Sequence, residues 1–277
     1  MMKPQFALAL CTALAMSAPA VATCPDESTT LRFGFYAHFN PVSYSADRDP
    51  AALGFNVHLG YEADLLSALE ATSGTNLKFK RTGIAVWDRI WLLAANSRYD
   101  VVGGGITILP ARTRDASGKR AIAFTRGHIR FRQSLLVRVK DASRLSRYAD
   151  LTSRDRVGVV RGTTGEIRLF ELMRHALPRV IAFPDETALI EALLEGSIDA
   201  VARGEIGNRA VERLYAGQLR VTALDTRVET GGFAVAAKNT ALAACIDRHI
   251  SHLTDNARIG YGAWLADPTV FMRRARQ

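Results

Sequence analysis

A strand that runs into three glycines, a threonine and an arginine is the segment of this sequence best suited to bind a small anion. It reads VVGGGITILPAR and ends at Arg112. Glycines at the end of a buried strand let backbone approach a ligand closely, and open α/β sheets bind ligands beyond the carboxyl ends of their strands. The hydroxyl of Thr107 and the forked guanidinium of Arg112 are suited to a carboxylate. The alternative is that Arg112 is a solvated loop cation.

Alternating strands and helices must position this half-site. The apolar pattern predicts an amphipathic helix over Trp87–Ala95, followed by a strand over Tyr99–Val102. The other predicted strands are Leu31–Phe35, Leu77–Arg81, Ser134–Val139, Arg156–Val160, Val180–Phe183, Ile198–Ala202, Leu219–Ala223 and Phe233–Ala237. The other predicted helices are Tyr61–Thr72, Ser143–Tyr148, Thr164–Ala176, Glu186–Glu195, Gly207–Ala216, Leu242–Arg258 and a short one near Ala263. This alternation indicates an α/β fold with helices packed on parallel strands.

Two long extended stretches interrupt the alternation, at Arg130–Lys140 and Thr226–Lys238. Each is apolar enough to be a strand, and neither has an obvious helix partner. Two such crossings predict a chain that leaves one lobe, builds a second and returns. We expect lobe 1 to comprise residues 23–138 with 231–277, and lobe 2 to comprise residues 139–230.

The first 22 residues are typical of an export signal that is removed from the mature protein. Lys3 is followed by a short apolar run from Phe6 to Met16 and by small residues up to Ala22, where we expect cleavage. The run is too short to span a membrane. We therefore expect a periplasmic protein of about 255 residues, long enough for one large domain or two ordinary ones.

The chain is basic, with a formal net charge of +9 that becomes +8 when Lys3 leaves with the signal. The cations are scattered singly and in pairs among acidic residues, and no basic run has interleaved aromatic residues for stacking on bases. We expect a solvated basic surface that steers small anions, and no nucleic-acid site.

Two cysteines, Cys24 and Cys245, remain after export, and an oxidising compartment allows a disulfide between them. The alternative is two unpaired thiols. Their spacing has no zinc pattern, and His249 and His252 have no third ligand near them in the sequence. The three glycines lack the Lys-Ser/Thr of a phosphate loop, and no serine occupies a nucleophile elbow. We therefore predict no metal and no cofactor.

Five motifs now occur in order along the chain. They are GYEADLLSALEATSG (60–74), VWDRIWLLAANSRYDVVGGGITILPAR (86–112), IAFT (122–125), VGVVRGTTGE (157–166) and SIDAVARGE (197–205). Together they resemble the periplasmic solute-binding proteins of family 3, the polar-amino-acid receptors of ABC importers, over nearly the whole mature chain. The resemblance implies a type II periplasmic-binding-protein fold, with two mixed sheets flanked by helices and two crossover hinge strands.

The resemblance also implies ligand-binding roles on the first lobe. Arg112 occupies the position of the arginine that binds the ligand α-carboxylate, with Thr107 and the backbone of Gly105 beside it. Phe39 matches an aromatic residue that covers the ligand side chain, and Trp87 matches the opposing wall. Aromatic residues in such places are also commonly part of the core.

On the second lobe, Gly162–Glu166 follows a strand and begins a helix. Thr163 or Thr164 can cap that helix, and its free N–H groups would receive a carboxylate from the opposite lobe. Ordinary capping without a ligand is the other reading, and the two are compatible. Glu166 lies in the first helical turn, where a negative charge is favourable for structural reasons alone.

One departure concerns the amino group of the ligand. Members of the family bind the α-ammonium through an aspartate at the position of Gly204. Either Glu205, one residue on, takes its place, or the ligand lacks an α-amino group. A further departure is an insertion around Asp115–Lys119, which lengthens the loop at the edge of the cleft.

The resemblance implies a monomeric binding protein that delivers a small carboxylate, an amino acid or a related organic acid, to an ABC-transporter permease. The alternative is an enzyme, since cyclohexadienyl dehydratases resemble this family closely. They use a glutamate at the position of Glu166 as a general acid in a GGTNE motif, where this chain has GTTGE. Ordinary receptors show the same motif, so Glu166 does not discriminate between the two functions.

Overall fold

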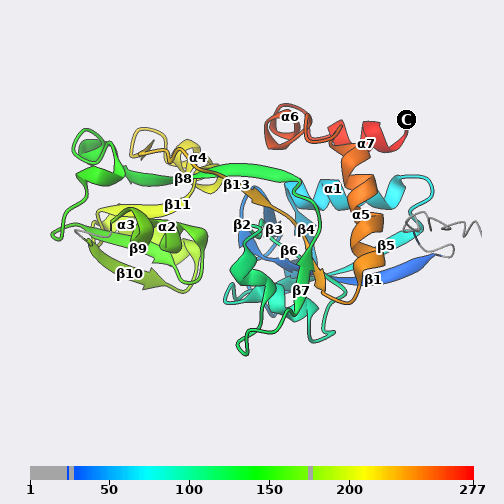
Figure 1. The fold of residues 1–277 in the computed structure, drawn as a ribbon. Coiled ribbons are helices and arrows are strands. Elements are labelled where there is room, and N and C mark those ends of the chain that lie inside the picture. The colour runs from blue at the N-terminus through cyan, green and yellow to red at the C-terminus, as the bar shows by residue number, and fades with distance from the viewer. Residues whose placement is uncertain (1–23, 25–27, 174–176) are drawn as a thin grey trace, which may run out of the picture.

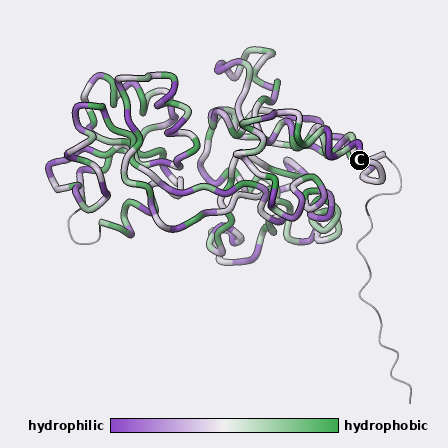
Figure 2. Tube along the Cα trace, turned by 90° about the horizontal axis from the view of Figure 1, so that it is seen from above, coloured by the Kyte–Doolittle hydropathy of each residue, from purple (hydrophilic) through white to green (hydrophobic). Residues whose placement is uncertain are grey.

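Two lobes, each built on its own sheet, lie side by side and are joined by extended chain (Figure 1). A computed structural model describes residue 24 and residues 28–173 and 177–277. The expected signal peptide, residues 1–22, lies outside the described residues. Figure 2, seen from above, also shows two separate bodies. This two-lobed α/β architecture is the one that the sequence predicted.

The first lobe contains a five-stranded mixed sheet in the order β5-β1-β6-β14-β7. Its strands are β1 (Thr29–Tyr36), β5 (Leu77–Ile84), β6 (Val101–Gly103), β7 (Ile122–Phe124) and β14 (Ala234–Ala236). β1 runs parallel to β5 and β6, whereas β14 is antiparallel to β6 and β7. The helices of this lobe are α1 (Tyr61–Ala71), α5 (Thr240–Leu253), α6 (Tyr261–Ala266) and α7 (Val270–Ala275).

A small antiparallel sheet, which the sequence did not predict, belongs to the same lobe. It consists of β2 (His38–Phe39), β3 (Ser43–Ser45) and β4 (His58–Leu59). Short 3-10 helices at Leu53–Asn56, Ile90–Ala94 and Pro110–Thr113 complete the connections of the lobe. β2 follows directly on β1 and so places Phe39 beside the carboxyl end of the main sheet.

The second lobe contains a mixed sheet in the order β10-β9-β11-β8-β12. Its strands are β8 (Ile129–Arg138), β9 (Arg156–Val160), β10 (Arg179–Phe183), β11 (Ala200–Gly204) and β12 (Leu219–Thr222). Its helices are α2 (Thr164–Leu172), α3 (Glu186–Glu195) and α4 (Glu205–Leu214), with 3-10 turns at Val139–Asp141 and Tyr148–Asp150.

Two strands carry the chain between the lobes. The first residues of β8, Ile129–Arg132, pair with β13 (Val228–Gly231), and the later ones pair with β11 and β12. Each strand therefore passes from one lobe to the other, as Figure 1 shows. These are the crossover strands predicted within Arg130–Lys140 and Thr226–Lys238. The exact lobe boundaries, at 138/139 and 230/231, stay a prediction.

Each lobe has an apolar interior against which its strands bury one or both faces. In the first lobe the fully buried ring of Phe33 meets Phe79 and Phe233 edge-on, at centroid distances of 5.8 and 5.4 Å. In the second lobe Leu135 of β8 and Val157 of β9 are buried against other apolar side chains. Burial of such side chains is the main favourable contribution to folding and fixes which face of each strand points inward.

Two predicted helices are wrong. Instead of a helix over Trp87–Ala95, only a 3-10 helix at Ile90–Ala94 forms, because Arg89 has a left-handed backbone with φ 49°. The segment Ser143–Tyr148 forms turns instead of a helix. There the carboxylate of Asp150 accepts the backbone N–H of Arg147 at 2.8 Å, which starts a new turn within the predicted helix.

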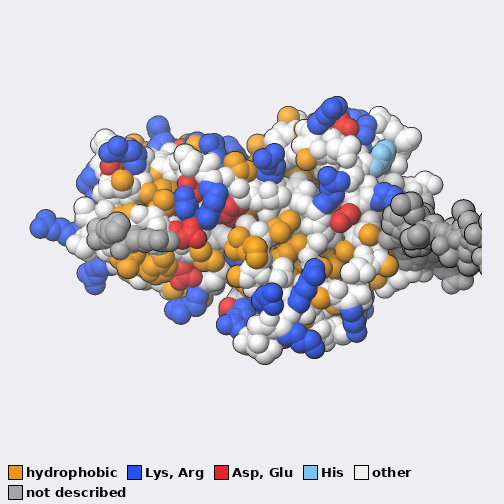
Figure 3. Space-filling model, viewed as in Figure 1, with side chains coloured by type: hydrophobic (Ala, Val, Ile, Leu, Met, Phe, Trp, Pro, Cys, Tyr) orange, Lys and Arg blue, Asp and Glu red, His pale blue; other side chains and the backbone are white. Residues whose placement is uncertain are grey.

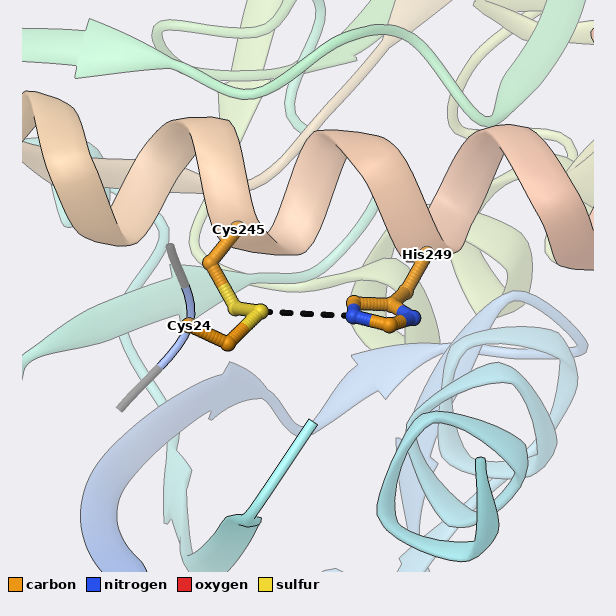
Figure 4. A group of neighbouring side chains, drawn as sticks. All are labelled: Cys24, Cys245 and His249. Atoms are coloured by element: carbon orange, nitrogen blue, oxygen red, sulfur yellow. Dashed lines mark hydrogen bonds between the residues drawn. A yellow bond between two sulfur atoms is a disulfide. The ribbon is translucent and has the colours of Figure 1, made fainter. Parts of the chain in front are cut away.

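A disulfide between Cys24 and Cys245 ties the chain before β1 to α5 (Figure 4). His249, one turn along α5, places its Nε2 3.3 Å from the Cys24 sulfur. These three side chains lie close enough to share a metal ion. Because the two sulfurs are bonded to each other, they are not the thiolates that a metal requires.

Among the helices that the structure describes, none combines the length and the apolar character that a membrane span needs.

Candidate ligand site between the lobes

A cavity of about 50 Å³ lies where the two lobes meet. Its described lining residues are Tyr36, Phe39, Trp87, Gly105 and Thr107 from the first lobe, Phe131 and Gln133 from β8, and Val160, Thr163, Thr164, Gly165, Glu186, Arg203 and Gly204 from the second lobe. Six residues predicted for ligand binding are among them: Phe39, Trp87, Gly105, Thr107, Thr163 and Thr164. The cavity is small because hydrogen bonds join the lobes directly across it.

The glycine turn after β6 forms the first-lobe side of the cavity. Gly104 and Gly105 have φ values of 129° and 69°, and a Cβ on Gly105 would lie 2.6 Å from the ring of Phe39. Their backbone N–H groups donate to the carboxylate of Glu62 at 2.7 and 2.8 Å. Glycine is therefore required for both the backbone conformation and the close approach. Glu62 was not predicted as a site residue; its signal in the sequence is a charge on the apolar face of α1.

Glu62 is fully buried behind this turn, and its carboxylate lies 3.6 Å from Nε2 of His128, which is also fully buried. Burial raises the pKa of Glu62 to about 7, although the two backbone N–H groups oppose that shift. Burial lowers the pKa of His128 to about 3. The turn is thus held by a carboxyl group whose protonation changes near neutral pH.

Arg112 is buried beside the cavity and touches both lobes, although it is not among the described residues that line the cavity. Its Nη1 donates to the carbonyl of Thr107 at 3.2 Å, and its Nη2 donates to the carbonyl of Gly162 in the second lobe at 3.0 Å. The guanidinium lies over the ring of Trp91 at 4.4 Å and near that of Trp87 at 5.7 Å. Burial lowers the pKa of Arg112 to about 10, so the group remains charged at neutral pH.

A chain of hydrogen bonds crosses the cavity at Thr107. Its hydroxyl donates to the buried carboxylate of Glu229 at 3.0 Å and lies 3.3 Å from the hydroxyl of Thr164. Because the single hydroxyl proton of Thr107 goes to Glu229, Thr164 is the donor between the two threonines. Thr164 in turn accepts from Nε2 of Gln133 at 3.0 Å. The lobes are therefore linked by oriented polar groups.

The start of α2 faces the same cavity. Thr163 caps the helix by accepting the N–H of Glu166 at 3.4 Å. The two N–H groups before it belong to Thr164 and Gly165, which line the cavity, and a helix start leaves such groups available to an anion. The carboxylate of Glu166 accepts the N–H of Gly162 at 2.7 Å and so closes the turn before the helix. This contact agrees with a structural role for Glu166.

Aromatic rings form the walls. Tyr36 and Trp87 meet edge-on at 5.0 Å, and Phe39 packs over Gly105. Tyr36, at the carboxyl end of β1, was not singled out in the sequence. Its hydroxyl and Nε1 of Trp87 are buried without a hydrogen-bond partner among the described residues. Buried polar atoms of this kind are normally satisfied, so they point to a ligand or water that would pair with them.

Glu205 does not line the cavity in the part of the chain that the structure describes. Its carboxylate pairs with Arg132, 3.4 Å away, and accepts the backbone N–H of that residue at 3.2 Å. Gly204 lines the cavity with backbone alone. Since Glu205 begins α4 and turns outward toward the crossover strand, the one-residue shift does not bring its carboxylate into the position of the expected aspartate.

Arg203 and Glu186 are charged residues of the cavity that sequence reasoning missed. Arg203 lies on β11, and its Nη1 is 2.6 Å from a carboxylate oxygen of Glu186, at the start of α3. Burial raises the pKa of Glu186 to about 7, although Arg203 opposes the shift. A charged residue within the otherwise apolar run AVAR was the available signal.

The geometry matches a known family of proteins. A sequence profile of the bacterial extracellular solute-binding proteins, family 3, matches residues 31–261. The chain belongs to this family. Its members are bacterial extracellular proteins that bind solutes, which agrees with a cavity closed between two lobes.

Individual relatives of this solute-binding protein are binding proteins too. It is 28% identical over 243 residues to a probable histidine-binding protein of Neisseria gonorrhoeae, covering 84% of each chain. An ancestral arginine-binding protein bound to arginine has a TM-score of 0.69 at 22% identity, covering 88% of this chain and 97% of that one. The ancestral amino acid-binding protein AncCDT-1, a precursor of cyclohexadienyl dehydratase, has a TM-score of 0.67 at 22% identity, covering 88% and 94%. The two structures support the fold.

Proposed function

We propose that this solute-binding protein captures a small carboxylate, an amino acid or a related organic acid, and delivers it to the permease of an ABC importer. The observation that carries the proposal is that Thr107 and the start of α2 line one cavity between the lobes, with the buried guanidinium of Arg112 bonded beside it to the carbonyls of Thr107 and Gly162. A carboxylate there would accept charge-assisted hydrogen bonds from Arg112 and from the N–H groups of Thr164 and Gly165.

In this proposal Thr163 and Thr164 position the start of α2, and Gly105 lets the ligand approach the backbone. Phe39 and Trp87 enclose the rest of the ligand. The two lobes would open and close through β8 and β13, because only these crossing strands need to absorb the rotation. The protein would work as a periplasmic monomer after cleavage near Ala22.

The names of the relatives support the ligand class. One relative is a probable histidine-binding protein, and the ancestral structure holds arginine. Both ligands carry an α-carboxylate. The likeness to a dehydratase precursor does not favour catalysis here, because the carboxylate of Glu166 is engaged with the backbone of Gly162. Incubation with prephenate should give no product above the uncatalysed rate.

Titration calorimetry of the purified protein with amino acids and organic acids tests the proposal. We expect at least one carboxylate to bind, and Arg112→Met to weaken that binding about 10- to 150-fold, the range for a hydrogen bond to a charged group. Arg114→Met is the matched control, since Arg114 is an exposed cation two residues away that contacts the carbonyl of Gly118. Equal affinity of the wild type and Arg112→Met would disprove the proposal.

A further inference from the structure

We propose that Arg203 is a second ligand-binding cation, and that the ligand is a small dicarboxylate with one carboxylate at Arg112 and the other at Arg203. This inference rests on the proposed function of the cavity and specifies its substrate class. It covers acidic amino acids and dicarboxylic acids and excludes ligands with a cationic side chain.

The first observation is the state of the Arg203 guanidinium. Arg203 is 6% exposed, lines the cavity, and has Nε and Nη2 without a hydrogen-bond partner among the described residues. Nη1 lies 2.6 Å from the carboxylate of Glu186 as an ion pair, but it too lacks a well-aligned hydrogen bond within the described part of the chain. A guanidinium has five donors in a planar fork, and leaving several of them unpaired in a buried site is costly. A ligand carboxylate would accept the unpaired edge.

The second observation is that Arg203 is held in place. Its guanidinium packs on Gly207 of α4, where a Cβ would lie 2.5 Å from Nη2 and 2.7 Å from Cζ. Glu186 fixes the other side of the group. The cation is therefore preorganised, which lowers the entropy lost when a ligand binds.

The third observation is the balance of unpaired donors and acceptors around the cavity. Besides Arg203, the unpaired donors are the hydroxyl of Tyr36 and Nε1 of Trp87, whereas Oε1 of Gln133 is the unpaired acceptor among the lining residues that the structure describes. Glu186 is committed to Arg203, and Gly204 contributes no carboxylate. A donor-rich cavity requires an acceptor-rich ligand, and a second carboxylate supplies the acceptors.

The position of Arg203 indicates which end of the ligand it would bind. Arg203 and Glu186 also line a larger groove of about 620 Å³ between the lobes, bordered by His38 and Arg48 of the first lobe. Arg112 does not line that groove in the described part of the chain. Nor is Arg112 among the described residues that line the cavity itself; its guanidinium lies beside the lining residues Thr107 and Trp87. The second carboxylate would therefore lie at the side of the cavity that Arg203 and Glu186 share with the groove.

Calorimetry with matched ligand pairs tests the inference. The pairs are L-glutamate with L-glutamine, L-aspartate with L-asparagine, and glutarate with its monoamide, with L-histidine and L-arginine added. Each pair differs by one charged oxygen and keeps its shape. We expect the preferred dicarboxylate to bind at least about 30-fold more tightly than its amide, as expected for a charge-assisted pair. Equal or tighter binding of the amide, or of histidine or arginine, would overturn the inference.

Variants assign the preference to Arg203. The double variant Arg203→Met with Glu186→Gln removes both charges, so that neither is left buried alone. We expect the double variant to bind a dicarboxylate and its amide with affinities within about threefold of each other. Arg203→Lys should show a preference for the dicarboxylate between those of the double variant and the wild type, because a lysine lacks the planar, two-pronged donor set of a guanidinium. Arg209→Met, on the exposed side of α4, should keep the wild-type preference.

The two proposals fail in different ways. If Arg112→Met abolishes binding of a monocarboxylate that the wild type prefers, the proposed function stands and the dicarboxylate inference is wrong. If the double variant retains the full preference while its near-ultraviolet circular dichroism matches that of the wild type, Arg203 is not the second cation. If no carboxylate binds the wild type, the proposed function fails, and the inference fails with it.

Discussion

Nη2 of Arg112, in the first lobe, lies 3.0 Å from the carbonyl oxygen of Gly162, in the second. The same guanidinium holds the carbonyl of Thr107 in its own lobe and lies 4.4 Å above the ring of Trp91. Among the described residues, this buried cation therefore bonds to carbonyl dipoles and packs on ring faces, and the charge of Glu229 favours it without a direct ion pair being formed. A carboxylate would be a stronger acceptor, and it would bridge the same two lobes.

The first prediction concerns the hydrogen-bond chain across the cavity. Thr107→Val keeps the shape of the side chain but leaves the carboxylate of Glu229 without its donor and Thr164 without its acceptor. Because both groups are buried and Thr107 and Thr164 line the cavity, we expect ligand affinity to fall about tenfold, equal to about 1.4 kcal/mol. Calorimetry measures it. Thr113→Val, whose hydroxyl bonds the carbonyl of Pro110, is the control and should bind normally.

The second prediction separates backbone strain from crowding. Gly105 and Gly118 both have positive φ, at 69° and 82°, but a Cβ on Gly105 would lie 2.6 Å from the ring of Phe39, whereas one on Gly118 would meet nothing within 4 Å. Each change to alanine costs about 1–2 kcal/mol of strain. Only Gly105→Ala should also displace Phe39 and abolish ligand binding. Equal affinities of the two variants would show that Phe39 does not shape the site.

The sequence could predict one half of the site better than the other. Thr107 and Arg112 follow a recognisable strand and glycine turn, so their place at the sheet edge was predictable from local pattern. Arg203 was not, because its environment depends on Glu186 and Gly207, which lie on the helices α3 and α4 that pack against its strand β11. Tertiary contacts of this kind leave no periodic signal in one sequence.

The same limit explains the wrong helix at Trp87–Ala95. Its apolar spacing fits a helix, and Trp87, Ile90, Trp91 and Ala94 are indeed buried. Yet the two indoles lie against the guanidinium of Arg112, and the left-handed backbone at Arg89 interrupts the helix between them. The pattern predicted which face is buried, while contacts distant in sequence determined the backbone.

The third prediction concerns the disulfide, which closes a loop of 221 residues between Cys24 and α5. Replacing both cysteines by alanine removes a constraint on the unfolded chain and should lower the free energy of unfolding by about 2–5 kcal/mol. Urea unfolding measures this loss. Because neither cysteine lines the cavity, the ligand affinity of the folded variant should not change. A fall in affinity with unchanged stability would contradict this assignment.

The fourth prediction is a dependence of stability on pH that comes from Glu62 and His128. The folded pKa of His128, about 3, lies below its ordinary value of 6.5, so the unfolded chain takes up a proton as the pH falls below 6.5 and stability is lost. The folded pKa of Glu62, about 7, lies above its ordinary value of 4.5, so its contribution to stability is complete below pH 4.5 and is lost as the pH rises toward 7.

Between pH 4.5 and 6.5 these two contributions therefore have opposite signs and largely cancel in the wild type. His128→Phe keeps a ring between Tyr61 and Phe233 and removes the imidazole contribution. Relative to the wild type, the variant should gain about 1.4 kcal/mol of stability for each pH unit of acidification in this range, the value for one proton. Urea unfolding of both proteins at pH 6.5, 5.5 and 4.5 measures the difference between their free energies of unfolding. The contributions of the other carboxylates, which both proteins share, cancel in this difference. A difference that does not change with pH would show that His128 is protonated in the folded protein.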